Sequence, residues 1–224
     1  MSVNTAKQAT PDSHKESILQ AAIAEFSRVG YAAASTNEIV RQANVSKGLL
    51  FHYFTSKEKL YIACQLHVME EYGQYMVKHS DYSSPDFFDR ILKNLYIKIE
   101  YGCRKPNYLT FINRAWFTEA KENPLQRSDA ESIVIQNMKG AGQPVSSTTE
   151  EMKNLLFKDI NTTLFREEVS LLKLLDYTRL VLEFSWERFS GRYNNDGPSM
   201  VQNIGSYLKE VEDIIMLIKH GAYK

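Results

Sequence analysis

The residues of this chain best suited to bind phosphate lie between Thr36 and Lys57. Lys47 and Lys57 each stand at the predicted start of a helix, and Thr36 stands at the start of another. The N-terminus of a helix offers free backbone amides and the positive end of the helix dipole, and both attract anions. A lysine at such a position adds a full positive charge. This arrangement therefore predicts a surface that contacts several phosphate groups.

The elements that would position these residues are two short helices joined by a tight turn over residues 44–46. Asn44 tolerates the left-handed backbone conformation that such a turn needs, and Ser46 is a good N-cap for the second helix. Apolar residues at helical spacing give each helix one buried face: Ile39, Val40 and Ala43 in the first, Leu50 and Phe54 in the second. The stretch predicts a helix-turn-helix, whose second helix can lie in the major groove of DNA.

Short motifs in and around this stretch occur together in a known family. They are Gly30-Tyr31, Ile39, Ala43-Asn44-Val45-Ser46-Lys47-Gly48, Leu50-Phe51-His52-Tyr53-Phe54 and Ser56-Lys57-Glu58-Lys59-Leu60. Taken together, they resemble the N-terminal domain of the TetR family of bacterial transcriptional regulators, over about Ser13 to Ala63. Asn44 stands where the family usually has Gly, a replacement of modest cost, and Phe51 stands where it usually has Tyr. The second change removes a hydroxyl that could touch the DNA backbone.

The resemblance implies roles for the exposed residues of the helix-turn-helix. Thr36, Lys47 and Lys57 are expected to hold the DNA backbone. The residues expected to face the groove or its walls are Gly48, Leu49, Phe51, His52 and Tyr53. Leu49 and Phe51 offer only apolar contact, for example with a thymine methyl. The second helix has no Arg, Asn or Gln after its start, so we expect sparse hydrogen-bonded reading of bases and a contribution from DNA shape.

The composition of the 224 residues is that of an ordinary soluble globular chain, with 43% hydrophobic and 24% charged residues. No apolar run approaches the ~18 residues that a membrane span needs, and residues 1–11 lack the apolar core of a signal peptide. Cys64 and Cys103 are the two cysteines, so a reducing, cytoplasmic location is expected and a disulfide framework is not. Residues 1–62 carry a net charge of +2 and the remainder −2, so charge alone would not indicate nucleic acid.

The apolar pattern predicts an all-α chain, because no stretch shows sustained strand alternation. We expect a flexible arm over residues 1–12, a DNA-binding domain of three helices over 13–62, and a larger helical domain for effector binding and dimerisation over 63–224. A fourth helix is predicted from near Lys57 to about Lys78. No linker interrupts it at the domain boundary, so it would join the two domains mechanically.

Local signals set the predicted helix boundaries. Capping boxes are predicted at Ser13 and Ser35, and Gly30 stands at the predicted end of the first helix. Thr55 or Ser56 is the predicted cap of the fourth helix. The later predicted elements are a helix from Ser84-Pro85, a helix from Lys105-Pro106, a helix over about 125–138, a loop over 139–149, and helices over about 150–165, 171–189 and 199–220.

Many of the aromatic residues lie between Phe87 and Trp186. For any single residue, core packing is the better interpretation. Taken together, they suggest a cavity lined by Tyr96, Tyr108, Phe111, Trp116, Phe117, Tyr177 and Trp186. The family resemblance implies an effector pocket in this region. Arg114 and Glu183 are the candidates for orienting a ligand there.

The last two predicted helices have apolar faces too broad for one small domain. The predicted dimer-interface residues on these faces are Leu182, Ile204, Leu208, Val211 and Ile215. Pairing with the same helices of a second copy, as a four-helix bundle about a two-fold axis, would cover them. The family dimerises in this way, so we expect a homodimer on a palindromic operator of double-stranded DNA.

Catalysis has little support in the sequence. Cys64 and His67 lie three apart on one predicted helix, but no further ligand is spaced to complete a metal site. A core cysteine and a partly buried histidine are the better interpretation, and no cofactor is expected. We therefore expect no enzyme but a repressor that a small hydrophobic or aromatic effector releases from its operator. Two alternatives stay open: a DNA-binding regulator without a small-molecule effector, and a helical enzyme or scaffold that retains the motif.

Overall fold

The computed structural model describes residues 11–115 and 157–224. Its elements are α1 (Pro11–Ala33), α2 (Thr36–Ala43), α3 (Lys47–Phe54), α4 (Lys57–His79), α5 (Phe87–Arg104), α6 (Pro106–Asn113), the 3-10 turn η2 (Thr162–Leu164), α10 (Leu171–Arg192), α11 (Gly197–Gln202) and α12 (Ile204–Ala222). Within the described residues every regular element is helical, and Phe165 and Tyr223 form an isolated antiparallel bridge. The prediction of an all-α chain is confirmed.

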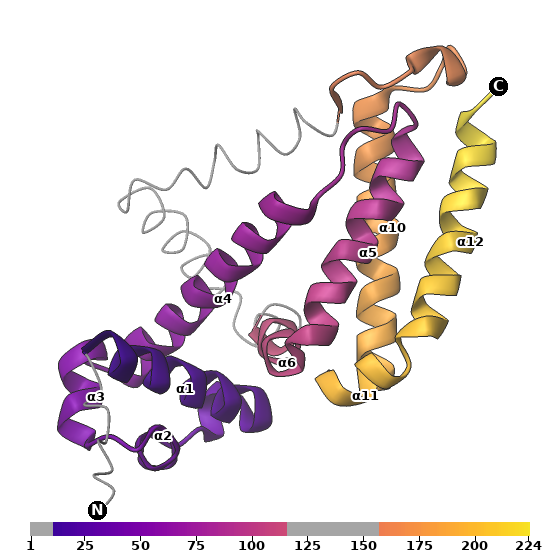
Figure 1. The fold of residues 1–224 in the computed structure, drawn as a ribbon. Coiled ribbons are helices and arrows are strands. Elements are labelled where there is room, and N and C mark those ends of the chain that lie inside the picture. The colour runs from indigo at the N-terminus through magenta and orange to yellow at the C-terminus, as the bar shows by residue number, and fades with distance from the viewer. Residues whose placement is uncertain (1–10, 116–156) are drawn as a thin grey trace, which may run out of the picture.

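The helices form two groups (Figure 1). Helices α1, α2 and α3 make a compact N-terminal group, and α4 leads away from it toward α5 (Figure 1). Helices α5, α10 and α12 pack together in the second group, and the short helices α6 and α11 lie at its end nearest the first (Figure 1). Because α4 contacts α1, α3 and α5, it belongs to both groups, as its sequence indicates.

Each group has an apolar core. The N-terminal core includes Ile18, Ala22, Phe26, Ile39, Leu50, Phe54, Leu60, Cys64, Val68, Tyr101, Tyr108 and Phe111. The C-terminal core includes Phe87, Phe88, Ile99, Leu174, Phe189, Met200, Tyr207, Val211 and Ile215. The N-terminal core extends past residue 62 into α4, α5 and α6, so packing is continuous across the predicted domain boundary.

The first helix differs from its prediction at the start and agrees with it at the end. α1 begins at Pro11, so Ser13 lies inside its first turn and the capping box predicted there is wrong. Near the other end, Gly30 has φ 78° and ψ 170°, which breaks the helical backbone where the sequence predicts the helix to end. Glycine adopts this positive φ without the Cβ clash that other residues would suffer.

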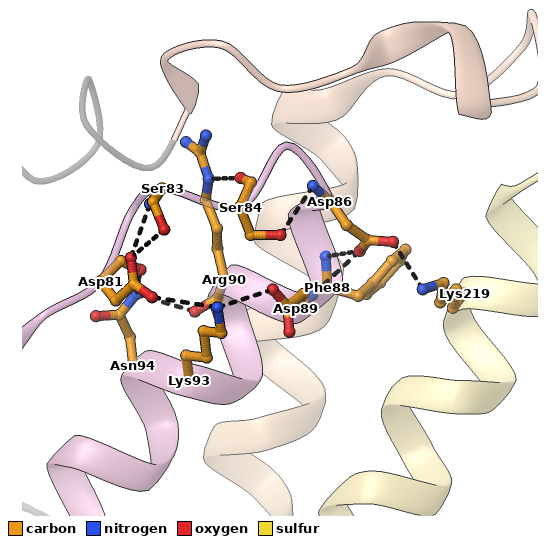
Figure 2. Close-up of polar contacts among 10 residues, drawn as sticks. All are labelled: Asp81, Ser83, Ser84, Asp86, Phe88, Asp89, Arg90, Lys93, Asn94 and Lys219. Atoms are coloured by element: carbon orange, nitrogen blue, oxygen red, sulfur yellow. Dashed lines mark hydrogen bonds and ion pairs between the residues drawn. The ribbon is translucent and has the colours of Figure 1, made fainter.

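The sequence predicts this helix from Ser84-Pro85, but α5 begins at Phe87 and is capped by Asp86. The Asp86 carboxylate accepts hydrogen bonds from the backbone N–H of Phe88 at 2.9 Å and of Asp89 at 3.1 Å. Its other oxygen pairs with Nζ of Lys219 at 2.7 Å, which ties the start of α5 to the end of α12 (Figure 2). Ser84 instead forms a turn, in which its Oγ accepts a hydrogen bond from the Asp86 N–H at 3.2 Å.

Charged residues of α5 also hold the segment before it (Figure 2). Arg90 is fully buried, and its Nε donates a hydrogen bond to the Ser84 carbonyl. Lys93, one turn further along, pairs with Asp81 at 3.1 Å and with Asp89 at 3.3 Å. These contacts fix the connection between α4 and α5.

The C-terminal part differs from its prediction in two places. The helix predicted over 199–220 is divided at Asn203 into α11 and α12. Of the helix predicted over about 150–165, residues 150–156 lie outside the described residues, and at its predicted end η2 is followed by an extended Phe165, so the prediction of helix up to residue 165 is wrong. Three predicted features lie outside the described residues: most of the arm over 1–12, the helix over about 125–138 and the loop over 139–149.

Candidate nucleic-acid interface

The turn between α2 and α3 has the geometry that its sequence predicts. Asn44 ends α2 in the left-handed conformation, with φ 53° and ψ 46°. The next amide, of Val45, donates to the Val40 carbonyl at 3.1 Å. Ser46 begins α3, and its Oγ accepts a hydrogen bond from the Leu49 N–H at 3.2 Å. The left-handed turn at Asn44 and the N-cap at Ser46 are both confirmed.

Helix α3 buries one side and leaves the rest open. Leu50 and Phe54 are four residues apart and both lie in the N-terminal core. The residues predicted to contact DNA make the remaining surface: Lys47, Gly48 and His52 are exposed, and Leu49, Phe51 and Tyr53 are partly buried. The His52 and Tyr53 rings meet at a steep angle with centroids 5.5 Å apart. This surface therefore presents a cation at its start and apolar and aromatic groups beyond it.

Lys57 makes contacts within the protein. Its Nζ donates to the Ala32 carbonyl at 3.1 Å and lies 4.9 Å from the centre of the Tyr31 ring. Both partners belong to the end of α1, so the Lys57 side chain connects the start of α4 to the end of α1. Ser56 caps α4 by accepting a hydrogen bond from the Lys59 N–H at 3.1 Å, as predicted. An ammonium group has three donors, so Lys57 has further N–H groups for a phosphate.

The buried carboxylate of Glu25 positions α2, a role that was not predicted from the sequence. Glu25 is 2% exposed, and its two oxygens accept hydrogen bonds from the Ser35 N–H at 3.2 Å and from Arg28 at 2.6 Å. Ser35 precedes α2, and its side chain makes no capping hydrogen bond, so the capping box predicted there is wrong. A buried charge is stable only when it is paired, so Glu25 fixes where α2 starts relative to α1. Its place beside Ala22 on the buried stripe of α1 is the sequence signal for this role.

Arg41, which is not among the predicted contacts, adds an exposed cation near the turn. Its Nε donates to Glu38 at 2.9 Å, and Gln42 donates to the same carboxylate at 2.8 Å. The hydrogen bonds from Arg41 and then Gln42 lower the pKa of Glu38 to about 2. Glu38 therefore stays ionised and offsets part of the Arg41 charge. Thr36 is half-buried at the first position of α2, the helix start where it is expected.

The described aromatic residues of the predicted pocket do not surround one cavity. Tyr108 and Phe111 are buried in the N-terminal core, where α6 meets α1. Trp186 packs against the C-terminal core, with its ring 5.1 Å from that of Tyr207. Tyr177 is 60% exposed. Grouping these four residues around one ligand is therefore wrong, because the helix faces that carry them have different neighbours.

The other predicted pocket residues are also dispersed. Tyr96 is exposed on α5, and its hydroxyl donates to Glu212 of α12. Glu183 is exposed on α10 and pairs with Arg179 at 3.4 Å. Arg114 is partly buried at the C-terminal end of α6. Trp116 and Phe117 lie outside the described residues.

Two of the residues predicted to form a dimer interface belong to the interior of the chain itself. Val211 and Ile215 are fully buried in the C-terminal core, so they have no surface to offer a second copy and that assignment is wrong. Leu182, Ile204 and Leu208 are partly buried against the same core. The exposed apolar face lies elsewhere on the same helices: Leu172, Tyr177, Leu180, Val181 and Phe184 on α10, and Met216 and Leu217 on α12.

Cys64 and His67 have structural partners. Cys64 is fully buried, and burial raises the pKa of its thiol well above the ordinary value. His67 is partly buried, with Nε2 3.2 Å from the Tyr108 hydroxyl, so the prediction of a core cysteine and a partly buried histidine is confirmed. Within residues 11–115 and 157–224, no group of three or more His, Cys, Asp or Glu side chains could hold a metal ion. None of the helices in these ranges combines the length and apolar character that a membrane crossing requires.

Residues 18–64, which contain the helix-turn-helix, match the family described as Bacterial regulatory proteins, tetR family. The chain is 30% identical over 103 residues to the HTH-type transcriptional repressor NicS of Pseudomonas putida, a match that covers 45% of this chain and 47% of that protein. It is 41% identical over 56 residues to the HTH-type transcriptional regulator RutR of Escherichia coli, covering 25% of this chain and 26% of that protein. The chain therefore matches about half the length of the first relative and less of the second.

Similarity of fold extends over nearly the whole chain. A TetR family transcriptional regulator from Chloroflexus aurantiacus superposes with a TM-score of 0.62 at 15% sequence identity, covering 96% of this chain and 95% of that one. The shared architecture is an N-terminal helix-turn-helix domain followed by a helical C-terminal domain.

Proposed function

Because this chain belongs to the TetR family of bacterial regulatory proteins, we propose that it is a DNA-binding transcriptional repressor. It binds a palindromic operator as a homodimer and leaves it when a small hydrophobic or aromatic effector binds. Proteins of this family are regulators and not enzymes. The observation that carries the proposal is the open surface of α3, whose first turn is capped by Ser46 and begins with the exposed Lys47.

The surface around α3 has the groups needed to hold the edges of a DNA groove. α3 lies at the outer edge of the molecule, on the side away from α10 and α12 (Figure 1). Lys47 at the start of α3 and Lys57 at the start of α4 supply cations near phosphates on either side of the helix. Between them, Leu49 and Phe51 supply apolar contacts that a thymine methyl can meet.

A second copy of the chain fits the exposed apolar face of α10 and α12. On α10 the residues recur at helical spacing and make one stripe: Tyr177, Leu180, Val181 and Phe184. Met216 and Leu217 extend the apolar surface on α12. Exposed apolar surface on two packed helices favours burial in a four-helix bundle with a two-fold partner. The two-fold axis then presents two α3 helices to two half-sites.

The effector acts through α4 in this proposal. Leu60 and Val68 of α4 lie in the N-terminal core, and further along α4 Tyr72 and Tyr75 pack on Tyr101, the residue through which α5 joins this core, with ring centroids 5.4 Å and 5.1 Å apart. A molecule that binds beside α5 and favours another position of α4 would change the separation of the two α3 helices and weaken DNA binding. Repression is proposed over activation because the relative NicS is a repressor.

Binding to the DNA upstream of its own gene tests the proposed function. Fluorescence anisotropy would compare this DNA with random DNA of the same length. Wild-type protein should bind the upstream DNA tighter by a factor of roughly 10³ or more. Lys47→Ala should weaken this binding, and Lys209→Ala, at an exposed position on α12, is the matched control that should not. Equal affinity for both DNAs, or no binding to either, would reject the proposal.

The effector is tested separately. Small molecules that co-purify with the protein would be identified by mass spectrometry and added to the protein–operator complex. Release of the operator by one of them is the expected result. A specific DNA complex that none of them releases would favour a regulator without a small-molecule effector.

A further inference from the structure

Helix α6 forms a bridge between the N-terminal helices and the turn that joins α10 to α12. Figure 1 shows α6 between α1 on one side and α11 on the other, and α6 contacts both. Residues two apart on a helix point in directions about 200° apart. Residues two apart on α6 can therefore contact opposite neighbours.

One face of α6 is packed into the N-terminal core. Phe111 is buried, and its ring centroid lies 5.4 Å from that of Tyr61 in α4. The Tyr108 hydroxyl accepts a hydrogen bond from Gln20 of α1 at 2.5 Å and lies 3.2 Å from Nε2 of His67 in α4. This face is therefore fixed to α1 and α4, the helices on which α2 and α3 are mounted.

The opposite face of α6 is bonded to α10 and α11. Oγ1 of Thr110 accepts a hydrogen bond from the backbone N–H of Gly197 at 2.6 Å and donates one to the Pro106 carbonyl at 3.1 Å. Asn113 accepts a hydrogen bond from Nε1 of Trp186 at 3.0 Å. Both Thr110 and Asn113 are buried, so water does not compete for these bonds. This face is therefore fixed to the C-terminal group.

The contact between α6 and α11 leaves no space for a side chain at Gly197. A Cβ atom there would lie 2.2 Å from the Pro106 carbonyl oxygen and 2.5 Å from Oγ1 of Thr110. Interiors packed this closely transmit a displacement to their neighbours because they have no free volume to absorb it. A movement of α11 would therefore displace α6 and, through it, α1.

We propose that the contact of Gly197 with Thr110 selects the spacing between operator half-sites, because it fixes the DNA-binding helices relative to the dimer helices. α11 joins α10 to α12, which carry the exposed apolar face, so α11, α6 and α1 connect that face to the recognition helix. A dimer of this kind reads half-sites about 34–36 Å apart, so a shift of α1 changes which spacing fits. Gly197 and Thr110 are thus positioning residues. The inference rests on the proposed function, since it needs a dimer that reads two half-sites.

The test is Gly197→Ala against Gly191→Ala. A Cβ at Gly191, in α10, meets nothing within 4 Å, so this variant is a matched control. Affinity would be measured on operators whose half-site spacing is varied one base pair at a time. Gly197→Ala should bind the natural spacing more weakly, by roughly the tenfold that one mismatched base pair costs, and should prefer another spacing. Gly191→Ala should stay within about twofold of wild type. A folded, dimeric Gly197→Ala with the wild-type affinity and preference would overturn the inference.

A second variant covers the case in which Gly197→Ala does not fold. Thr110→Val keeps the shape of the side chain and removes the hydrogen bond to Gly197, and Thr110→Ser restores the hydroxyl. Thr110→Val should broaden the spacing preference, and Thr110→Ser should recover it. An unchanged preference in Thr110→Val, or equal broadening in both variants, would overturn the inference.

A measurement without DNA separates this inference from the proposed function. Spin labels would be attached at Lys15→Cys, an exposed position on α1, in a Cys103→Ser background, and the distance between the two labels of the dimer measured. Gly197→Ala should change this distance and Gly191→Ala should not. No change in Gly197→Ala contradicts the inference even if wild-type protein binds its operator. Absence of DNA binding by wild type, with the distance change present, contradicts only the proposed function.

Discussion

Two residues near the end of α12 lie on opposite sides of the helix. One packs in the core, and the other lies on the face proposed to form the dimer. Ile215 is 1% exposed and belongs to the C-terminal core, whereas Leu217 is 74% exposed. We predict that Ile215→Ala lowers the stability of the fold and that Leu217→Ala weakens the dimer. Both changes remove three carbon atoms, so the difference in their effects reports the surroundings and not the size of the substitution.

The magnitudes follow from burial. A buried Ile replaced by Ala costs about 2–5 kcal/mol, because the transfer free energy is lost and a cavity remains. Each kcal/mol lowers the Tm of a chain of this size by about 2–4 °C, so Ile215→Ala should lower Tm by roughly 4–20 °C. Leu217 is 74% exposed, so at about 0.8 kcal/mol per methylene its truncation should cost the fold only about 0.6 kcal/mol.

The cost of Leu217→Ala should appear in assembly instead. If the exposed part of Leu217 is buried in both copies of a dimer, truncation removes about 3.5 kcal/mol of the free energy of dimerisation. The dissociation constant should then rise by a factor of roughly 10^2.5. Sedimentation over a dilution series measures this constant. Thermal unfolding is measured at a protein concentration well above this dissociation constant, because dimerisation itself raises Tm. A Leu217→Ala dimer as tight as wild type, or an Ile215→Ala protein with unchanged Tm, would refute the assignment of the two faces.

Three other predictions concern charged groups. Lys47→Ala should reduce the slope of log affinity against log salt by about 0.9 per phosphate contact, or about 1.8 per dimer, whereas Leu49→Ala should leave the slope unchanged in the same titration. Glu25→Ala should lower the free energy of unfolding in urea by about 1–3 kcal/mol, because the backbone amide before α2 loses its buried acceptor; an unchanged unfolding midpoint would argue against this role. Burial raises the pKa of Asp86, but the hydrogen bonds from Lys219 and from the backbone amide of Asp89 outweigh burial and lower the pKa overall. Stability from this pair is therefore present above the unfolded pKa of about 3.9 and lost as pH falls through the folded value, so Lys219→Met should flatten the acid limb of the stability profile.

The helix-turn-helix was predictable because its determinants are local. The left-handed conformation of Asn44 and the capping hydrogen bonds of Ser46 and Ser56 involve residues within about one helical turn of each other. Where several nearby side chains could cap, the pattern is ambiguous. Ser84 and Asp86 both carry suitable oxygens, and the ion pair with Lys219, distant in sequence, accompanies the choice of Asp86.

The partners of the apolar faces were not predictable, because periodicity identifies a face but not what covers it. The spacing of Val211 and Ile215 marks a buried stripe, which their own α5 and α10 cover instead of a second copy. The sequence likewise predicts Tyr108 and Phe111 as pocket residues, although they belong to the core that α6 shares with α1. The close approach at Gly197 depends on residues about ninety positions earlier, beyond the reach of any local pattern.

Helix α4 contacts both groups of helices, and its length would convert a small rotation at one end into a large displacement at the other. Its 23 residues span about 34 Å from Lys57 to His79 at 1.5 Å per residue. A rotation of about 5° around the His79 end therefore carries the Lys57 end through about 3 Å, close to the 3.4 Å rise of one base pair. A tilt small enough to be absorbed by side-chain adjustments beside Tyr72 and Tyr75 thus becomes a misfit of nearly one base-pair step where α3 would meet DNA.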